Sequence, residues 1–350
     1  MDDRSFVAAQ DLILDMKKHW TTQLYPALKA EYRELAPDPE PAKREEVAAI
    51  LENTTSCQFF AWMERHLQRM KYSGRYGLVP YHRERAADLR GSLPDLADDP
   101  RLELNPDFVN PVYYETVDVH QHPGGVWSEP TAGFVYERGA RSTTPMLGAR
   151  HRDLHGRLTD RAIRDGVPER MLDMGCGFGK STRPFYEELR DTWVEAVDLA
   201  APCLELAAAD AATAQAENVR FRQMSAYETD YDDESFDLVT STMLLHEMPP
   251  EEIGKTFDEC ARVLKPGGRM VHLDFYVLPD AFSEFIHYGH SRRNNEPFMI
   301  PLAEMNVRDE LEARGFTDVS IEPFAEADGV DLDNSQYWRF PWTVISASRP

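Results

Sequence analysis

The sequence predicts an α/β protein in which a mainly helical first part precedes a doubly wound, mostly parallel sheet. Three observations support this fold class. Apolar residues recur at helical spacing over 1–75. From about residue 170, short apolar runs alternate with segments of helical length. The first of these runs ends in a glycine-rich turn, as expected where a buried strand feeds a helix.

Length and charge limit the function classes. The chain has 350 residues, with 38 lysines and arginines against 61 aspartates and glutamates, and its formal net charge is −23. Sequence-independent binding of nucleic acid needs a basic surface, and so does binding to an anionic membrane, so the acidity argues against both partners. The length favours two domains, which we place at 1–150 and 151–350.

Other features bear on the compartment. The sequence has no run of 18 apolar residues and its N-terminus is acidic, so we expect neither a transmembrane helix nor a secretory signal. The four cysteines form no CxxC or similar pair, which argues against a zinc site and a disulfide framework. These are Cys57, Cys176, Cys203 and Cys260. We therefore expect a cytoplasmic protein with free thiols.

The first part is expected to contain two long helices separated by a proline-rich break. A loop rich in proline and aspartate follows, and the next stretch, rich in aromatic residues and glycine, has no clear periodicity. In order, we predict a helix over 6–20, a helix over 42–70, a loop over 93–106, an unassigned stretch over 107–150 and a helix over 154–163.

The second part alternates strands and helices. Strands are predicted over 170–174, 193–197, 219–223, 236–240 and 269–275, and helices over 180–189, 202–214, 250–264 and 307–314. Two final strands, 319–321 and 342–347, are expected to form a closing hairpin. In such sheets the ligand lies beyond the carboxyl ends of the strands.

A glycine-rich turn after the first of these strands suggests a ligand. Gly175, Gly177 and Gly179 are spaced GxGxG and a helix follows. Glycines let a backbone approach a ligand closely, and a helix N-terminus offers free N–H groups. The dinucleotide fingerprint is GxGxxG instead, and the anionic Asp173 would repel a pyrophosphate but suit a cationic amine. Asp198 ends the next strand, where it could accept hydrogen bonds from both hydroxyls of a ribose.

These segments resemble the class I S-adenosylmethionine-dependent methyltransferases. The resemblance covers roughly residues 165–349 and is greatest for the small-molecule branch that includes the ubiquinone and menaquinone biosynthesis methyltransferases. Besides the glycine loop, it rests on 198–205, 236–249 and 259–269. It implies a Rossmann-like, seven-stranded sheet with a C-terminal antiparallel hairpin, S-adenosylmethionine as cofactor and S-adenosylhomocysteine as product.

The resemblance also implies cofactor contacts. Asp173 and the glycine loop would hold the amino-acid end of the cofactor, Asp198 would bind the ribose, and the adenine would lie between Leu199 and Cys203. Many relatives have an acidic residue after the third strand, and this chain has none there, so Ser225 or a backbone group must substitute. The implied cofactor-binding residues are Asp173, Gly175, Cys176, Gly177, Gly179, Asp198, Leu199, Cys203, Ser225, Ala226 and Thr242.

Histidines are the candidates for catalysis. His246 follows the fourth strand and is the best single candidate for a base or a substrate contact, although it could instead cap the turn or contact the N-terminal domain. His120 and His122 precede a Pro-Gly-Gly turn and are further candidates. They could share a metal, but no carboxylate–histidine helix motif surrounds them, so we predict no metal and expect them to help line the substrate pocket.

Two groups of residues are expected to contact the substrate. Tyr114 and Tyr136, with the neighbouring Trp127, would exclude water from the pocket. The basic stretch 285–295 falls where this fold often inserts a lid, and it could bind an anionic acceptor such as a carboxylate. Its candidate contacts are Tyr288, His290, Arg292 and Arg293. The alternative for this stretch is a solvated loop or a subunit contact.

The resemblance implies a role for the helical part, because such domains in small-molecule methyltransferases often dimerise and close the pocket. We therefore expect a homodimer and a substrate cap. The leading interpretation is a cytosolic methyltransferase for a small acceptor that carries an anionic group. A tRNA or protein methyltransferase and a non-catalytic cofactor-binding regulator are the alternatives, while the glycine spacing disfavours a nicotinamide-dependent reductase.

Overall fold

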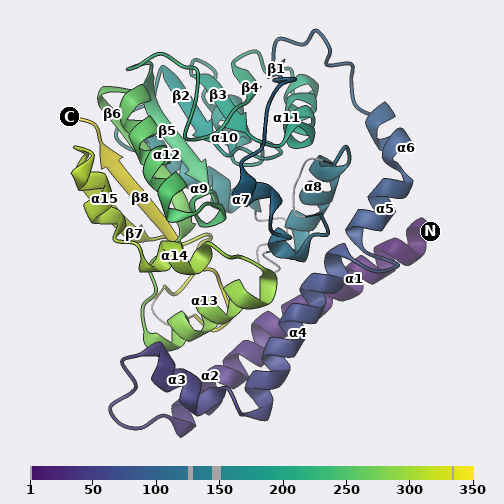
Figure 1. The fold of residues 1–350 in the computed structure, drawn as a ribbon, viewed down its shortest axis with the longest axis vertical. Coiled ribbons are helices and arrows are strands. Elements are labelled where there is room, and N and C mark those ends of the chain that lie inside the picture. The colour runs from purple at the N-terminus through teal and green to yellow at the C-terminus, as the bar shows by residue number, and fades with distance from the viewer. Residues whose placement is uncertain (1, 125–128, 144–150, 333–334) are drawn as a thin grey trace.

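One sheet organises the chain, as the computed structural model in Figure 1 shows. The structure describes residues 2–124, 129–143, 151–332 and 335–350, so Trp127 lies outside it. Eight strands run in the order β1-β4-β3-β2-β5-β6-β8-β7. They are β1 (Leu102–Glu103), β2 (Arg170–Met174), β3 (Trp193–Asp198), β4 (Val219–Gln223), β5 (Phe236–Thr242), β6 (Leu264–Phe275), β7 (Thr317–Pro323) and β8 (Trp342–Ser348).

Strands β1 to β6 are mutually parallel, whereas β8 pairs antiparallel with both β6 and β7. The doubly wound α/β fold with an antiparallel C-terminal pair is thus confirmed. The strand order changes direction at β2, because the chain first adds β3 on one side and later β5 on the other, which places a topological switch point at the carboxyl end of β2. The glycine loop begins there.

The eighth strand, β1, comes from the helical part and corrects the expected count of seven. The sequence predicts a loop over these residues, because a strand of two residues is too short to show an alternating pattern. Leu102 pairs with Phe221 at the sheet edge, and Arg101 donates from Nε to the carbonyl of Ala216 at 2.7 Å. The first part of the chain therefore contributes a strand to the sheet of the second part.

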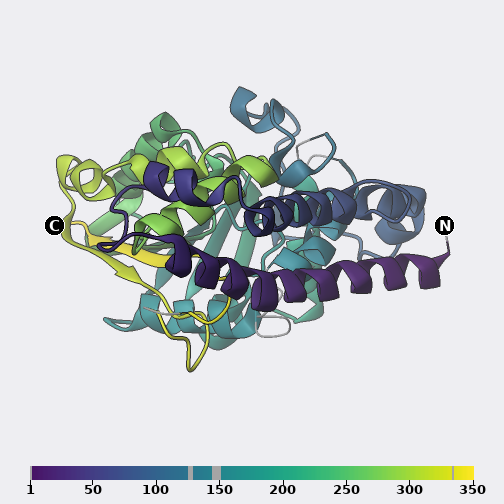
Figure 2. The same ribbon diagram turned by 90° about the horizontal axis from the view of Figure 1, so that it is seen from below.

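Helices cover both faces of the sheet (Figure 2). On one face α9 (His151–Ile163), α10 (Thr182–Glu188) and α11 (Ala201–Thr213) share a buried cluster with Met171 and Leu238. On the other, α12 (Pro250–Val263), α14 (Met299–Glu304) and α15 (Val307–Ala313) pack with Leu172 and Val239. Neighbouring residues of one strand thus enter opposite cores, as the pleat of a strand requires.

The first part is helical as predicted, with one correction. The helix expected over 42–70 is two helices, α3 (Arg44–Leu51) and α4 (Thr55–Tyr72). Thr54 separates them because its hydroxyl accepts from the N–H of Cys57 at 3.2 Å and so caps α4. Helix α13 (Ala281–Asn294), which belongs to the second part of the sequence, packs against both α3 and α4.

A π-helical turn interrupts the first helix. Helix α1 (Asp3–His19) continues into η1 (Trp20–Leu24) and α2 (Tyr25–Leu35), and the N–H of Tyr25 donates to the carbonyl of Trp20. Trp20 stacks on Phe60 with ring centres 4.5 Å apart and donates its indole N–H to the Phe60 carbonyl at 3.0 Å. Such turns occur mostly as single insertions within α-helices, and they are frequent at functional sites.

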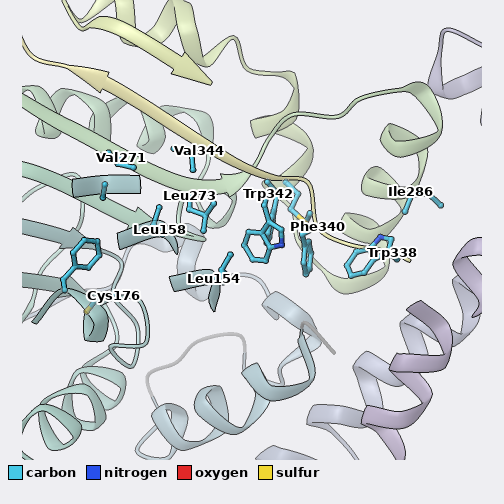
Figure 3. Close-up of a cluster of buried hydrophobic side chains, with 14 of the residues drawn as sticks. Leu154, Leu158, Cys176, Val271, Leu273, Ile286, Trp338, Phe340, Trp342 and Val344 are labelled. Atoms are coloured by element: carbon cyan, nitrogen blue, oxygen red, sulfur yellow. The ribbon is translucent and has the colours of Figure 1, made fainter. Parts of the chain in front are cut away.

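An aromatic row connects the sheet to the helical part, and Figure 3 shows three aromatic residues of this region, Trp338, Phe340 and Trp342, at the start of β8. Phe275 at the end of β6 stacks on Phe340 with ring centres 4.1 Å apart. Phe340 meets Trp338 at 4.6 Å, and Trp338 meets Trp20 at 5.1 Å. The row runs from the carboxyl end of the sheet to the π-helical turn.

The short elements α5 (Leu78–Glu84), α6 (Ala86–Gly91), α7 (Val112–Glu115), η2 (Val119–Gln121) and α8 (Ala132–Thr143) complete the first part. The four cysteines are buried free thiols. Among the described residues, no helix is both long and apolar enough to cross a membrane.

Candidate active site

Two cavities meet at the carboxyl end of the sheet. The smaller leaves about 880 Å³ free of protein atoms and the larger about 1270 Å³, in both cases including space open to solvent. Several residues line both cavities and so form a shared wall. These are His120, Tyr136, Gly175, Gly177, Met243 and Glu247. A ligand in one cavity would therefore lie beside a ligand in the other.

The glycine loop forms part of this wall, and its three glycines are required by conformation and space. Gly175, Gly177 and Gly179 have φ of +67°, +52° and +79°. A Cβ at Gly175 would come within 2.5 Å of Leu244, and one at Gly179 within 2.9 Å of Ala207. Side chains are unfavourable there on both counts, so the loop can present backbone to a ligand.

Asp173 lies behind the loop and lines neither cavity. Its carboxylate accepts hydrogen bonds from Ser181 at 3.1 Å, Thr182 at 2.7 Å and Thr240 at 3.0 Å. Burial raises the pKa of Asp173 to about 6, against these three hydrogen bonds. Ser181 does line the larger cavity. The geometry therefore suits an indirect role, in which Asp173 fixes Ser181 and the start of α10.

Asp198 lines the smaller cavity and ties the glycine loop to β3. One carboxylate oxygen accepts from the N–H of Gly177 and the other from the N–H of Ala200, both at 2.8 Å. Burial raises the pKa of Asp198, which these backbone hydrogen bonds oppose. Leu199 and Cys203 line the same cavity. The structure thus brings the expected ribose and adenine contacts together.

The segment after β4 completes the smaller cavity. Ser225 and Ala226 line it, and the hydroxyl of Ser225 accepts from the N–H of Tyr227 at 3.3 Å. Tyr114, expected in the substrate pocket, lines this cavity instead, whereas Tyr136 lies on the shared wall.

The end of β5 faces the larger cavity. The buried hydroxyl of Thr242 has no hydrogen-bond partner in the described part of the chain. Met243 follows with φ of +56° and donates its N–H to the Leu273 carbonyl at 2.8 Å. Cys176 also lines this cavity. A left-handed methionine is uncommon, and here it turns the chain along the shared wall.

His246 forms a buried dyad with Asp274. Its Nδ1 lies 2.5 Å from Oδ1 of Asp274, which also accepts from the N–H of Phe275, while Oδ2 accepts from the N–H of Leu245. Burial lowers the pKa of His246, but the carboxylate outweighs burial and raises this pKa to about 9. His246 lines the larger cavity, so the structure places this candidate where an acceptor could bind. Asp274 was not predicted from the sequence, because nothing in its strand distinguishes it from a surface carboxylate.

His120 lies between two carboxylates. Its Nε2 is 3.1 Å from Glu247, and its Nδ1 contacts Glu296. Burial lowers the pKa of His120, but Glu296 and Glu247 reverse this effect and raise the pKa to about 10. The φ of His120 is +57°, a conformation that this turn imposes.

His122 does not join His120. It is buried edge-on against Tyr72, with ring centres 5.3 Å apart, and burial lowers its pKa to about 4. It lines neither of the two cavities. His120 and His122 therefore lie in different environments, and the shared metal site that their spacing suggested is not formed between them.

The basic stretch divides between two places. His290 lines the larger cavity, but Tyr288, Arg292 and Arg293 line a separate hollow beside α3. Arg293 is paired with the buried carboxylate of Glu64, which His290 also contacts at 2.6 Å. The structure therefore does not place these arginines in the larger cavity, because one is needed to balance a buried charge and the other is exposed.

Other walls of the larger cavity come from remote segments that sequence analysis did not identify. They include Lys17, Trp20, Gln68, Phe275, Trp338 and Phe340. Lys17 donates to Gln68 at 2.9 Å, and burial lowers the pKa of Lys17 to about 8 despite Glu64. No local motif marks these residues, because only the packing of α1, α4 and the 338–340 segment brings them together.

Comparison with known proteins shows which class of protein this chain is similar to. Residues 171–268 match the methyltransferase domain family. The chain is 33% identical to the uncharacterised methyltransferase YcgJ of Bacillus subtilis over 37% of this chain and 49% of that protein. It is 35% identical to the 27-O-demethylrifamycin SV methyltransferase of Amycolatopsis mediterranei over 35% of this chain and 46% of that protein. It is 33% identical to the demethylmenaquinone methyltransferase of Clavibacter sepedonicus over 46% of this chain and 62% of that protein. The chain thus spans about half the length of the first two relatives.

The matched region is the one that carries the glycine loop, Asp198 and the end of β5. The chain therefore contains a region that matches the methyltransferase domain family, which agrees with the resemblance indicated by the four motifs. None of the three matches is long enough to cover both the domain and the helical part.

Proposed function

We propose that this chain transfers a methyl group from S-adenosylmethionine to a small aromatic acceptor. The observation that carries the proposal is the wall shared by the two cavities. One cavity contains the cofactor-type contacts of Asp198 and the glycine loop, and the other contains an aromatic surface and the His246–Asp274 dyad. Methyl transfer requires two ligands held side by side, and this arrangement provides that.

The residues of the smaller cavity fit the cofactor. Asp198 would bind the ribose, Leu199 and Cys203 would flank the adenine, and the loop at Gly175 and Gly177 would admit the amino-acid end toward Ser181 and Thr242. The room that only glycine leaves and the unpartnered hydroxyl of Thr242 support this orientation. When bound, S-adenosylmethionine supplies an electrophilic methyl group on a sulfonium.

The walls of the larger cavity favour a flat, aromatic acceptor. Trp20, Phe275, Trp338 and Phe340 present ring surfaces, and aromatic pairs add attraction beyond simple burial. The anionic acceptor expected from Arg292 and Arg293 loses its support, because neither arginine lines this cavity. The names of two relatives, a demethylmenaquinone and a demethylrifamycin methyltransferase, also support a small-molecule acceptor.

His246 would act as the base for an acceptor that is protonated at neutral pH. Asp274 holds Nδ1, and Nε2, which lies 3.6 Å from Glu247, would take the acceptor's proton as the acceptor bonds to the methyl carbon and the methyl–sulfur bond breaks. Because its pKa is raised to about 9, His246 is mostly protonated at pH 7. We expect kcat to rise with pH up to about 9. In Asp274→Asn the rise of kcat should occur at lower pH, because the carboxylate that raises the pKa of His246 is gone.

Incubation with methyl-labelled S-adenosylmethionine and cell extract tests the proposal. Small molecules are separated from RNA and protein, and Asp274→Asn serves as the matched control. We expect label in the small-molecule fraction, reduced in the variant. Label confined to RNA or protein would overturn the acceptor class, and cofactor binding with no transfer would overturn the activity.

The homodimer, the substrate-capping role of 1–150 and the cytoplasmic location stay predictions. Light scattering on the purified chain measures the first directly.

A further inference from the structure

We infer that His120, Glu247 and Glu296 form a binding site for one divalent transition-metal ion in the shared wall. One ligand atom from each residue lies within 4.8 Å of the other two. Donors around a first-row ion are about 2.0–2.2 Å from it, so neighbouring donors are about 3–4 Å apart. The 3.1 Å between His120 Nε2 and Glu247 already has this spacing. Only small side-chain shifts would be needed.

A buried oxygen without a partner gives independent support. Glu296 is 4% exposed, and its Oε2 has no hydrogen bond from any described residue. An isolated buried carboxylate oxygen is costly unless something compensates it. Glu296 lines the larger cavity, so a cation there could reach this oxygen.

The other buried carboxylates nearby are compensated in a way that this pair is not. Glu64 is matched by Arg293, His290 and Asn294. Asp274 is matched by His246 and two backbone N–H groups. Glu247 and Glu296 instead share the imidazole of His120, and Glu247 has one further contact, at 3.6 Å from Nε2 of His246. Two carboxylates and a neutral imidazole carry a charge of −2, which one divalent cation balances.

The donor set indicates the kind of cation. Imidazole with carboxylates suits Mn²⁺, Fe²⁺ or Zn²⁺ better than Ca²⁺ or Mg²⁺, which prefer oxygen donors alone. His120 and Glu247 line both cavities, so an ion here would border each of them. If the proposed function holds, an oxygen of the acceptor could occupy an open position on the ion.

Metal binding is measured without relying on activity. The chain is stripped with chelator, dialysed and titrated with MnCl₂, and free Mn²⁺ is followed by electron paramagnetic resonance. We expect one tightly bound Mn²⁺ per chain, displaced by Zn²⁺ and not by equal Mg²⁺. Binding should raise the melting temperature and release a proton from His120. Glu296→Gln should weaken binding at least tenfold, whereas Glu304→Gln, which lies outside both cavities, should leave it unchanged.

The outcomes separate this site from the proposed function. Absence of stoichiometric Mn²⁺ and Zn²⁺ binding, or equal binding by Glu296→Gln and the native chain, would overturn the site. A Glu296→Gln protein with native circular dichroism excludes misfolding as the cause of lost binding. Metal binding without methyl transfer would support the metal site and overturn the proposed activity. Methyl transfer by a chain that binds no metal would support the activity and overturn the metal site.

Discussion

The two cavities were assembled in different ways. The smaller is built largely from successive strand ends between β2 and β5, so residues near in sequence carry it. The larger collects side chains from α1, α4, the segment around Glu296 and the 338–340 segment. The proposed cofactor side therefore depends on local motifs, whereas the proposed acceptor side forms only once distant helices have packed. Variants on the two sides should have separable effects.

The largest expected effect lies on the acceptor side. His246→Gln and Asp274→Asn should lower kcat by about 10²- to 10⁴-fold, the range typical of general acid–base groups. Affinity for S-adenosylmethionine, measured by calorimetry, should stay within about twofold. The exposed histidine His66 on α4 provides the control His66→Gln, which should behave as the native chain. If a dyad variant lost cofactor affinity by as large a factor as it lost kcat, the separate roles proposed for the two cavities would be contradicted.

On the cofactor side, Asp198→Ala should weaken S-adenosylmethionine binding by about 10- to 100-fold. Two backbone N–H groups lose their charged acceptor, and such hydrogen bonds contribute about 1.5–3 kcal/mol each. Binding of an acceptor in the larger cavity should hardly change. Asp191→Ala, at an exposed position before β3, is the control. Unaltered cofactor affinity in Asp198→Ala would contradict the assignment.

A smaller effect is expected at the loop. Gly175→Ala places a Cβ where φ is +67° and Leu244 lies at 2.5 Å, so the loop must shift. A left-handed non-glycine residue costs about 1–2 kcal/mol, which predicts roughly a tenfold loss of cofactor affinity and a lower melting temperature. Gly156→Ala on α9, where a Cβ meets nothing within 4 Å, should stabilise the chain or leave it unaltered.

The smallest effect is expected for Arg292→Ala. Its side chain is exposed and lines the separate hollow beside α3. Steady-state kinetics should show less than a twofold change in the acceptor KM, as is usual for exposed substitutions. A tenfold rise in KM would restore the anionic acceptor that the basic stretch first indicated.

Much of the sheet and the cofactor side could be predicted from sequence. Periodicity placed β2 to β6, and the glycine spacing with Asp198 placed the smaller cavity, because these depend on neighbours along the chain. The role of Asp173 was only partly foreseen, since the three hydroxyls that surround it come from two different elements.

The acceptor side could not be predicted. Asp274 has its importance only because β6 runs beside β5, and Glu296 only because its segment packs on η2. The separation of α3 from α4 depends on one capping hydroxyl, and β1 on two paired residues. Asp274, Glu296 and β1 act through tertiary contacts, so composition and period carry no trace of them, whereas the Thr54 cap is a local signal that the apolar period over 42–70 masked.

The π-helical turn at Trp20–Leu24 contains one residue more than a regular helical turn, and this extra residue sets which side chains of α1 face the larger cavity. Each residue of an α-helix advances it by about 100°, so deleting Thr22 to restore regular geometry would rotate α1 about its axis. Lys17 would then swing away from Gln68 and the cavity wall. A single-codon deletion here should change which acceptors fit, while Thr22→Ser should not, and competition binding with aromatic acceptors of graded size would reveal it. We therefore predict that the number of residues in this turn affects acceptor selectivity more than their identity does.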